Sequence, residues 1–336
     1  MNHSRATLEQ KDNFGSGWLR WLNTLGPVLA LAAVYGLFAL IAPASFRTTR
    51  NLEMIARQTT IVGVAALGMT LVIISGGIDL SVGSIVALST VVIAWLLQYA
   101  GTGPITAALG GVAAAACFGF LSGMLITRLR VVPFIVTLGM MLVVRGTAKG
   151  IGQEQKIDVN PELLKWLEQL LASVPKEHRW MLLPPGVWLL VVLAVAMAAL
   201  LRYTRVGRHT FAIGSNEQTA RLCGVAVERV KLFVYTLCGA FAGLAGLMQF
   251  SRLTVGDPTV AIGLELDVIA AVVIGGGSLS GGEGSILGTL VGALIMTVIA
   301  SGCTQMGLYN WVQEIITGAI IVLAVALDRL RHRRIA

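Results

Sequence analysis

The chain has 336 residues, of which 56% are hydrophobic and only 12% are charged, and its mean hydropathy is +0.80. Soluble domains carry roughly 25% charged residues, so this composition leaves too little polar surface for a soluble globule and excludes a soluble enzyme domain. The formal net charge of +8 does not indicate nucleic-acid binding, because the basic residues lie between apolar runs and form no patch with interleaved aromatic residues.

Ten apolar runs predict an all-α, polytopic integral membrane protein with about ten transmembrane helices, some of them short or broken by glycine. Each run approaches the roughly 20 residues that cross a hydrocarbon core of about 30 Å. The runs are 27–43, 58–75, 83–100, 104–127, 132–148, 184–201, 232–251, 261–277, 285–301 and 310–328. The first has no small-residue cleavage site, so we expect a retained helix.

The distribution of lysine and arginine predicts the orientation of the chain. An inside N-terminus places most of the 25 basic residues on the inner side. An even number of crossings then puts both termini in the cytoplasm. This gives a cytoplasmic segment 1–26, a transmembrane domain 27–328 with an outer segment 150–183 and an inner loop 202–231, and a basic cytoplasmic tail 329–336. Three arginines fall on the outer side and disagree with this orientation: Arg47, Arg50 and Arg57. An interfacial helix that carries them would remove the disagreement.

The two longer polar segments each predict a short helix. In 150–183, the stretch PELLKWLEQLLA has helical spacing, with Asn160 and Pro161 as cap and first turn, and predicts an amphipathic helix on the outer surface. In 202–231, a helix is expected from about Asn216 to Cys223, with turns at glycines on either side. A basic loop is ordinarily a positive-inside signal, but this arrangement could also dock into a cytosolic partner.

Segment 68–88, GMTLVIISGGIDLSVGSIVAL, contains polar residues and a glycine pair inside an apolar run: Gly76, Gly77, Asp79 and Ser81. A helix break in a membrane must have its backbone groups satisfied by protein or by water in a cavity. One interpretation is a break that lines or gates a pore, with Asp79 facing a cavity or a cation. The other is a tight turn in which Asp79 or Ser81 caps the next helix. The residues alone leave both open.

Segment 265–295 resembles this first break and suggests an internal repeat. The shared features are a glycine pair, then Leu-Ser, then Gly-Ser-Ile, offset by about 200 residues, and transporters are often built from such repeats. The candidate path or gating residues here are Gly276, Gly277, Ser280 and Glu283. Glu283 has a functional interpretation, although a water-exposed loop would explain it equally well.

Several other residues have a simpler interpretation as packing residues. Small residues recur along two helices and predict close helix contact: Gly284, Gly288 and Gly292 on one, and Gly239, Gly243 and Gly246 on the other. The four cysteines form no CxxC pair and are expected to be reduced packing residues. Arg145 and Lys149 end a helix and could snorkel to the interface. No metal site is indicated.

No catalytic or nucleotide-binding motif is present in the sequence. There is no GxxxxGK[ST], so the chain does not supply its own P-loop ATPase, and no HExxH, GxSxG or paired-carboxylate constellation indicates catalysis. We therefore expect that the chain is not an enzyme. Energy for transport must come from an ion gradient, from a partner protein, or from neither.

Five motifs in order resemble the permease subunits of bacterial ATP-binding-cassette importers for sugars, of the ribose, xylose and galactose type. The resemblance covers most of the chain, from about Asn51 to Asp328. The motifs are SGGIDLSVGS at 75–84, VPFIVTLGMMLVVRG at 132–146, VGRHTFAIGSNEQTARLCGV at 206–225, ELDVIAAVVIGGGSLSGGEGSILGTLVGALI at 265–295, and QEIITGAIIVLAVALD at 313–328.

The resemblance implies an inner-membrane permease that forms the path for a monosaccharide or related polyol. It implies three kinds of partner: ATPase subunits that carry ATP and Mg, a second permease copy or paralogue, and a periplasmic sugar-binding protein. No cofactor is expected in this chain. The ATPase-coupling residues implied are Gly214, Asn216, Glu217, Ala220, Arg221 and Gly224. The family has Ala-Ala then Ser-Gly where this chain has Thr219-Ala220 and Cys223-Gly224, so partner choice could differ.

Two other functions remain as alternatives. An ion-coupled secondary transporter would require carboxylates or unwound helices near the membrane midplane, and Asp79 is its strongest candidate. A cassette permease for another small solute, such as branched-chain amino acids, is the nearer alternative, because such permeases are distant relatives of the sugar type.

Overall fold

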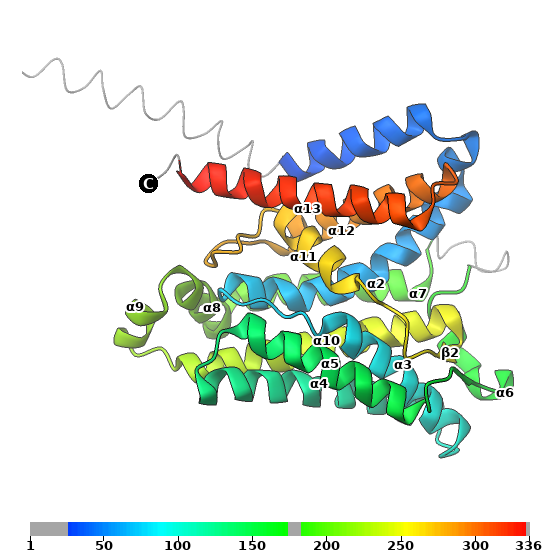
Figure 1. Ribbon diagram of the computed structural model, residues 1–336, viewed down its shortest axis with the longest axis horizontal. Coiled ribbons are helices and arrows are strands. Elements are labelled where there is room, and N and C mark those ends of the chain that lie inside the picture. The colour runs from blue at the N-terminus through cyan, green and yellow to red at the C-terminus, as the bar shows by residue number, and fades with distance from the viewer. Residues whose placement is uncertain (1–25, 174–182, 334–336) are drawn as a thin grey trace, which may run out of the picture.

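A computed structural model describes residues 26–173 and 183–333, which are almost entirely helical (Figure 1). Apart from the helix Gly26–Ile41, the elements are η1 Ala44–Arg47, α2 Thr49–Ile74, α3 Val82–Gln98, α4 Pro104–Leu129, α5 Pro133–Ile151, β1 Ile157–Asp158, α6 Pro161–Leu164, η2 Lys165–Leu170, α7 Pro185–Tyr203, α8 Arg205–Ser215, α9 Glu217–Leu222, α10 Val227–Leu253, β2 Val255–Gly256, α11 Leu264–Ile274, α12 Ile286–Gln305 and α13 Asn310–Arg333. The predicted N-terminal segment, apart from Gly26, and the last three residues of the tail lie outside the described ranges.

Every one of the ten predicted apolar runs coincides with a helix, which confirms the all-α membrane fold. The count of ten crossings is not confirmed. Six helices in the described ranges are long and apolar enough to cross a membrane, namely α2, α4, α5, α7, α10 and α12. Three more apolar stretches are shorter: Gly26–Ile41, α3, and Asn310–Leu323 within α13. α11 rises only about 16 Å, roughly half of a hydrocarbon core, because the glycines at its end stop it early.

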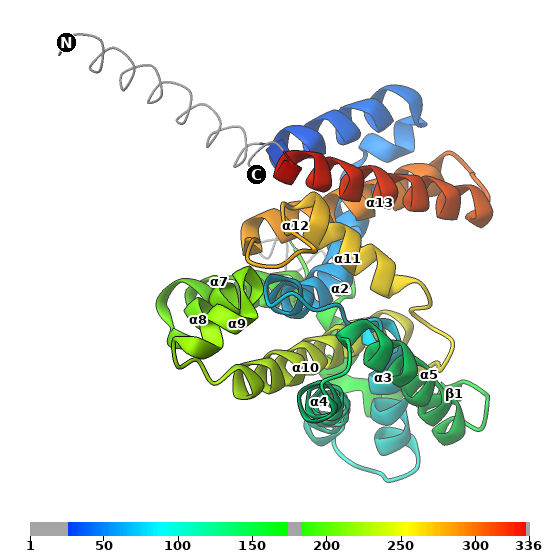
Figure 2. The same cartoon turned by 60° about the vertical axis from the view of Figure 1, so that its left-hand side comes forward.

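The long helices lie side by side and place the two polar segments at opposite ends (Figures 1 and 2). α8 and α9 stand at one end of α10, and α6 and β2 stand at the other. The helix Gly26–Ile41 and α13 lie together at one edge, with α11 and α12 between them and α2. The segments predicted to face opposite sides of a membrane are therefore at opposite ends of the molecule.

α2 is the central helix, buried along most of its length, and hydroxyl pairs join it to α12. Thr59 Oγ1 lies 2.6 Å from Thr297 Oγ1, and Thr70 Oγ1 lies 2.8 Å from Thr289 Oγ1. Residue numbers rise along α2 as they fall along α12, so the two helices are antiparallel. Hydroxyl bonds of this kind link helices in lipid, where apolar surface by itself gives little drive to associate.

α4 and α10 approach each other through glycine. A β-carbon at Gly119 would lie 2.9 Å from the Cα of Gly239, and one at Gly243 would lie 2.6 Å from the Cβ of Ala115. Gly246 faces α3 in the same way, since a β-carbon there would lie 2.5 Å from the Cβ of Ser89. The predicted packing role of the small residues on α10 is therefore confirmed.

The three arginines that disagreed with the predicted orientation lie on an extension of α2 and on η1, the 3₁₀ helix before it. This helix begins at Thr49, well before the predicted start of the apolar run, so that Arg50 and Arg57 are on its first turns and Arg47 ends η1. Arg57 Nη1 donates a hydrogen bond of 3.1 Å to Ser173 Oγ. A polar helical extension beside the segment 150–173 accords with an interfacial position for these cations.

The outer polar segment folds differently from the prediction. Asn160 caps α6 as expected, its side chain accepting a hydrogen bond of 3.1 Å from Glu162 N–H. The prediction of a continuous amphipathic helix is wrong, however. α6 ends after one turn, and a 3₁₀ helix follows, with Lys165 at φ 46°. The segment instead follows contacts with the rest of the chain, such as the 2.9 Å hydrogen bond from Leu171 N–H to Ser251 Oγ.

A short antiparallel pairing of β1 and β2 closes this end of the molecule. Beside it, Lys156 Nζ lies 3.3 Å from Asp257 Oδ2. Burial would raise the pKa of the Asp257 carboxyl, but hydrogen bonds from Thr259 and the charge of Lys156 outweigh it, so this pKa lies below its usual value.

The contact between α11 and α12 leads to a stability prediction. Gly292→Ala should lower the free energy of unfolding by about 1–3 kcal/mol or more, because the added carbon overpacks the helix pair. That β-carbon would lie 1.9 Å from the carbonyl oxygen of Ala271. Gly139→Ala on α5 is the matched control, since nothing lies within 4 Å of its β-carbon. Thermal unfolding in detergent measures both, and equal melting temperatures for the two variants would contradict the contact.

Candidate functional site

The two glycine pairs close α2 and α11 with the same backbone turn. At the end of α2, Gly77 N–H donates to the carbonyl of Val72 at 2.9 Å, and Gly76 has φ 78°. At the end of α11, Gly277 N–H donates to the carbonyl of Val272 at 2.8 Å, and Gly276 has φ 92°. Both are Schellman caps, which need a left-handed residue that glycine adopts without steric cost. The repeat suggested by the sequence therefore holds for the geometry of the two helix ends.

The loop after α2 encloses Asp79 completely in protein. Asp79 has no exposed surface, and its Oδ1 accepts hydrogen bonds from Ser81 N–H at 2.9 Å and from Ser81 Oγ at 2.5 Å. This is a turn in which the aspartate side chain holds the backbone two residues on. Within the described ranges, Asp79 Oδ2 accepts no hydrogen bond from any nitrogen or oxygen. The tight turn of the second interpretation is thus present, but among the residues described no side-chain hydrogen bond from Ser81 caps α3, and Asp79 holds the turn and not the helix end.

α10 forms the wall against which this turn rests. Tyr235, which is only 1% exposed, carries its hydroxyl toward Gly77, where a β-carbon would lie 2.3 Å from it. Cys238 is buried one turn further along and interacts with Asp79. Among the described residues Tyr235 Oη makes no hydrogen bond. Tyr235 and Cys238 were not identified as site residues from the sequence, because nothing in an apolar run distinguishes the helix face that meets the break.

The loop after α11 is longer and partly exposed. Ser278 is buried and its Oγ accepts from Ser280 N–H at 3.3 Å, while its own N–H donates to the carbonyl of Glu283 at 3.2 Å. The side chains of Ser280 and Glu283 are exposed, which matches the water-exposed alternative for Glu283. Gly284 lies in this loop and not on α12. Gly288 packs against the end of α11 as expected, since a β-carbon there would lie 1.9 Å from the Gly275 carbonyl oxygen.

The two breaks meet the end of α8 at a contact made of backbone. Gly282 N–H donates to the carbonyl of Ile74 at 2.9 Å. A β-carbon at Gly281 would lie 3.0 Å from the Cα of Gly76, and one at Gly214 would lie 1.7 Å from the carbonyl oxygen of Ile74. We call Gly76, Gly214, Gly281 and Gly282 the glycine junction. It joins the predicted path residues to the predicted coupling segment, which the sequence treats as separate.

Beyond the junction the chain enters α9, the helix predicted from Asn216 to Cys223. Asn216 caps it, its Oδ1 accepting from Thr219 N–H at 2.8 Å, and Gly224 ends it with φ 83°. α8, which precedes it, was not predicted, because its charged and apolar residues alternate in a segment that reads as a basic loop. Together α8 and α9 form a short helical hairpin at one end of the molecule.

The coupling residues divide into an exposed group and a buried one. Ala220, expected at a close contact with a partner, is only 4% exposed and packs within its own chain, because this side of the short helix α9 turns inward. That part of the prediction is wrong for this structure. Gly224 is exposed with open space around its Cα. Leu222, which the sequence analysis did not single out, is 88% exposed and is the apolar side chain that this tip presents.

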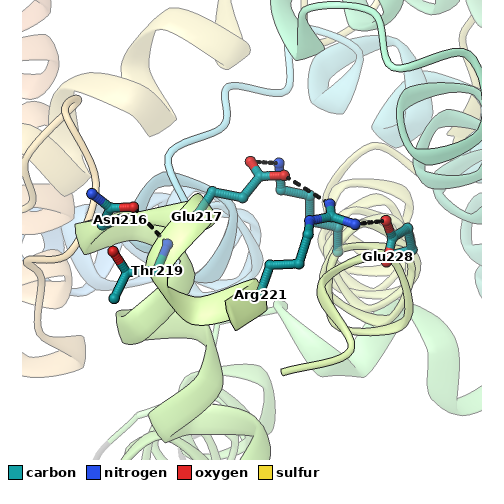
Figure 3. Close-up of polar contacts among 6 residues, drawn as sticks. Asn216, Glu217, Thr219, Arg221 and Glu228 are labelled. Carbon is teal, nitrogen blue, oxygen red and sulfur yellow. Dashed lines mark hydrogen bonds and ion pairs between the residues drawn. The ribbon is translucent and has the colours of Figure 1, made fainter. Parts of the chain in front are cut away.

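Ion pairs attach α9 to the start of α10 (Figure 3). Arg221 bonds to Glu228 and lies 3.4 Å from Glu217 Oε1, and Lys231 Nζ lies 2.6 Å from Glu217 Oε2. A cavity of about 290 Å³ lies beside them, walled by the connection between α4 and α5 around Arg130. The charged residues of this end thus form a network across two helices.

Arg145 was expected to snorkel but instead binds backbone. Its Nη1 donates to the carbonyls of Pro258 at 2.9 Å and Val260 at 2.7 Å, which ties α5 to the connection between α10 and α11. Glu265, near the start of α11, lies against Gly83 of α3, where a β-carbon would fall 2.2 Å from its Oε2. These contacts tie the start of α11 and the connection before it to α3 and α5.

The contact between Gly77 and Tyr235 can be tested by a double mutant. Gly77→Ala should destabilise the protein by about 1–3 kcal/mol, because buried Tyr235 cannot move its hydroxyl aside. Tyr235→Phe should be neutral or stabilising, since it removes a buried hydroxyl without a partner. Combining the two should restore much of the lost stability, measured by thermal unfolding in detergent. Simple additivity of the two changes would contradict the contact.

Comparison with known proteins shows similarity over nearly the whole chain. The family model described as "Branched-chain amino acid transport system / permease component" matches residues 51–325. The chain is 37% identical over 316 residues to the ribose import permease protein RbsC of Escherichia coli K12, covering 93% of this chain and 95% of that protein. It is 36% identical to the L-arabinose ABC transporter permease protein AraH of Azospirillum brasilense, covering 95% and 91%. It is 34% identical to the fructose import permease protein FrcC of Rhizobium meliloti, covering 90% and 84%. No solved structure gives a significant match.

Proposed function

The chain belongs to the family of transport-system permease components whose model covers residues 51–325, and we propose that it forms the translocation path of an ATP-binding-cassette importer for a monosaccharide or related polyol. The observation that carries this proposal is the similarity to ribose, arabinose and fructose import permeases across nine-tenths of the chain or more. That similarity extends over both glycine breaks and α9. The family description names branched-chain amino acids, so the sugar assignment depends on these individual relatives.

The proposed assembly has several parts. A second permease, identical or paralogous, completes the path, two ATPase subunits carrying ATP and Mg lie on the α8–α9 side, and a periplasmic binding protein delivers the sugar on the β1–β2 side. The chain lies in the inner membrane with both termini in the cytoplasm. Two exposed residues, Leu222 at the end of α9 and Gly224 just after it, supply the surface that docks on the ATPase.

The glycine junction suggests how docking and translocation are linked. Gly214 is in the last turn of α8, just before α9, and is in backbone contact with the end of α2 and with the loop that follows α11. Backbones that touch without intervening side chains move together, because a packed contact cannot be compressed. ATP binding closes the ATPase subunits and moves α9, and the junction then shifts α2 and α11 between outward-open and inward-open arrangements. Hydrolysis of ATP on the ATPase subunits, followed by release of phosphate and ADP, resets the cycle.

Affinity for sugar need not reside in this chain, since the binding protein supplies it. A path that releases its substrate on each cycle is better without a tight site. The residues proposed to line or gate the path are Gly76, Gly77, Asp79, Ser81, Gly276, Gly277, Ser280 and Glu283. In this arrangement the two glycine pairs, Asp79 and Ser81 hold the helix breaks, and the exposed Ser280 and Glu283 face water.

Co-purification tests the proposal directly. Gentle detergent extraction of the tagged chain should bring down a P-loop ATPase, and the companion binding protein should bind a pentose or hexose. Recovery of the chain alone, even after crosslinking, with uptake that survives ATP depletion but collapses with an ionophore, would overturn the cassette assignment. An amino acid bound to the cognate binding protein would overturn the sugar assignment and leave the cassette assignment in place.

Gly224→Trp should block ATPase docking while membrane insertion is retained, because it places bulk at the exposed end of α9. Gly224→Asn is the matched control, since asparagine tolerates the left-handed conformation at φ 83° without comparable bulk. The measurement is the amount of ATPase that co-purifies with each variant at equal membrane level. Normal recovery with the tryptophan variant would remove Gly224 from the docking surface.

Asp79→Ala should reduce transport more than it reduces expression. It leaves the Ser81 N–H and hydroxyl without their acceptor inside the break, a cost of about 1–3 kcal/mol. Asp79→Asn keeps an oxygen that can accept both hydrogen bonds but removes the negative charge, so it tests the role of the charge apart from that of the turn. If the asparagine variant transports normally, only the turn matters. If alanine lowers expression and transport equally, Asp79 is purely structural and has no part in gating.

A further inference from the structure

Ion pairs are concentrated around α9. Only 12% of the chain is charged. Within the ranges that the structure describes there are four ion pairs, and three of them involve Glu217 or Arg221 of α9. A helix of six residues has too few hydrogen bonds to hold its own position. The network that attaches α9 to α10 therefore helps to fix its direction, together with the buried side chain of Ala220.

The pair between Glu217 and Lys231 is the best shielded of the three. The Lys231 side chain is 16% exposed, whereas those of Glu217, Arg221 and Glu228 are 44–49% exposed. Fully exposed pairs are screened by water and salt and contribute little. Lys231 Nζ is instead held largely inside the protein at 2.6 Å from Glu217 Oε2, while Arg221 binds the other oxygen of the same carboxylate. Both oxygens of Glu217 are thus committed to a cation.

Lys231 also begins a face of α10 that leads to the first helix break. Lys231, Tyr235 and Cys238 follow at spacings of four and three, which places them on one side of the helix. Tyr235 Oη faces Gly77, and Cys238 lies beside Asp79. One face of α10 therefore binds α9 at its first turns and supports the break about two turns further along.

We propose that the ion pair between Glu217 and Lys231 clamps α9 to α10, and that Lys231 is the positioning residue through which displacement of α9 reaches the break at Gly77 and Asp79. This rests on the proposed function for the source of the displacement, which is the ATPase docked on α9. The clamp supplies a second connection beside the glycine junction. α9 is connected to the break in two ways: through α8 by the covalent chain and the glycine junction, and through α10 by the ion pair. A tilt of α9 therefore acts on both connections.

The clamp predicts uncoupling when it is broken. Lys231→Met should retain the ATPase on co-purification and hydrolyse ATP, yet lower sugar uptake per ATP by roughly 2- to 30-fold, and Glu217→Gln should lower uptake per ATP over the same range. The swap Glu217→Lys with Lys231→Glu should restore much of that loss, which a merely structural role for either residue would not do. Arg229→Met is the matched control, because Arg229 is an exposed cation two residues before Lys231 and in none of the ion pairs of the described residues. Uptake per ATP at the normal level in Lys231→Met, or no recovery in the swap, would overturn the proposal.

A second measurement does not depend on the ATPase. Cys223 is an exposed thiol at the end of α9, and a nitroxide attached to it in the Cys117→Ser background reports the mobility of this helix in the purified full chain. Lys231→Met and Glu217→Gln should sharpen the spectrum, the swap should reverse this, and Arg229→Met should leave it unchanged. An unchanged spectrum in Lys231→Met would overturn the clamp. If no ATPase associates with the wild-type chain, the proposed function fails, and the spectrum still decides whether the clamp exists.

Discussion

A helix that stops inside an apolar layer must find partners for its freed backbone groups within the protein, and the structure is arranged around this requirement. The ends of α2 and α11 meet it with the same Schellman turn, closed by Gly76 and Gly276. A backbone carbonyl that the turn leaves unpaired is satisfied between the two breaks, where Gly282 N–H donates a hydrogen bond to the carbonyl of Ile74. Such bonds require backbones in contact, so glycine occupies the meeting point, and the end of α8 fits there only because Gly214 has no side chain.

Close backbone contact also explains how the rest of the bundle is held. α4 and α10 touch through Gly119 and Gly239, and α11 and α12 touch through Gly292. Hydroxyl pairs join α2 to α12 where glycine is not used. Charge enters mainly at the α8–α9 end, where Glu217 and Arg221 join a short helix to a long one. The two kinds of contact occupy different places for a physical reason. Glycine and hydroxyl contacts stabilise helix pairs within an apolar layer, whereas an ion pair loses less hydration energy where water remains nearby.

The two kinds of contact converge on the same small region. The glycine junction connects α9 to the broken helices through α8, and α10 connects them through Lys231 and Tyr235. Asp79 lies between these connections, fully enclosed, with one oxygen holding the turn at Ser81. A buried carboxylate in such a place reports any rearrangement of the break, because it loses its hydrogen bonds when the turn opens. The region is therefore suited to transmit movement between the end of the molecule and its centre.

The sequence by itself determined the membrane fold, the positions of the helical runs and the two glycine breaks, because long apolar runs and glycine pairs act locally. Asn216 and Asn160 were recognisable as helix caps for the same reason, since capping depends on residues three or fewer apart. Ala220 was misplaced and the outer helix after Pro161 proved discontinuous, because both depend on what packs beside them. Only the tertiary structure decided that Gly76, Gly214 and Gly281 touch and that Tyr235 faces Gly77. Those contacts join residues more than sixty positions apart, and no local pattern in an apolar helix records which of its faces will meet them.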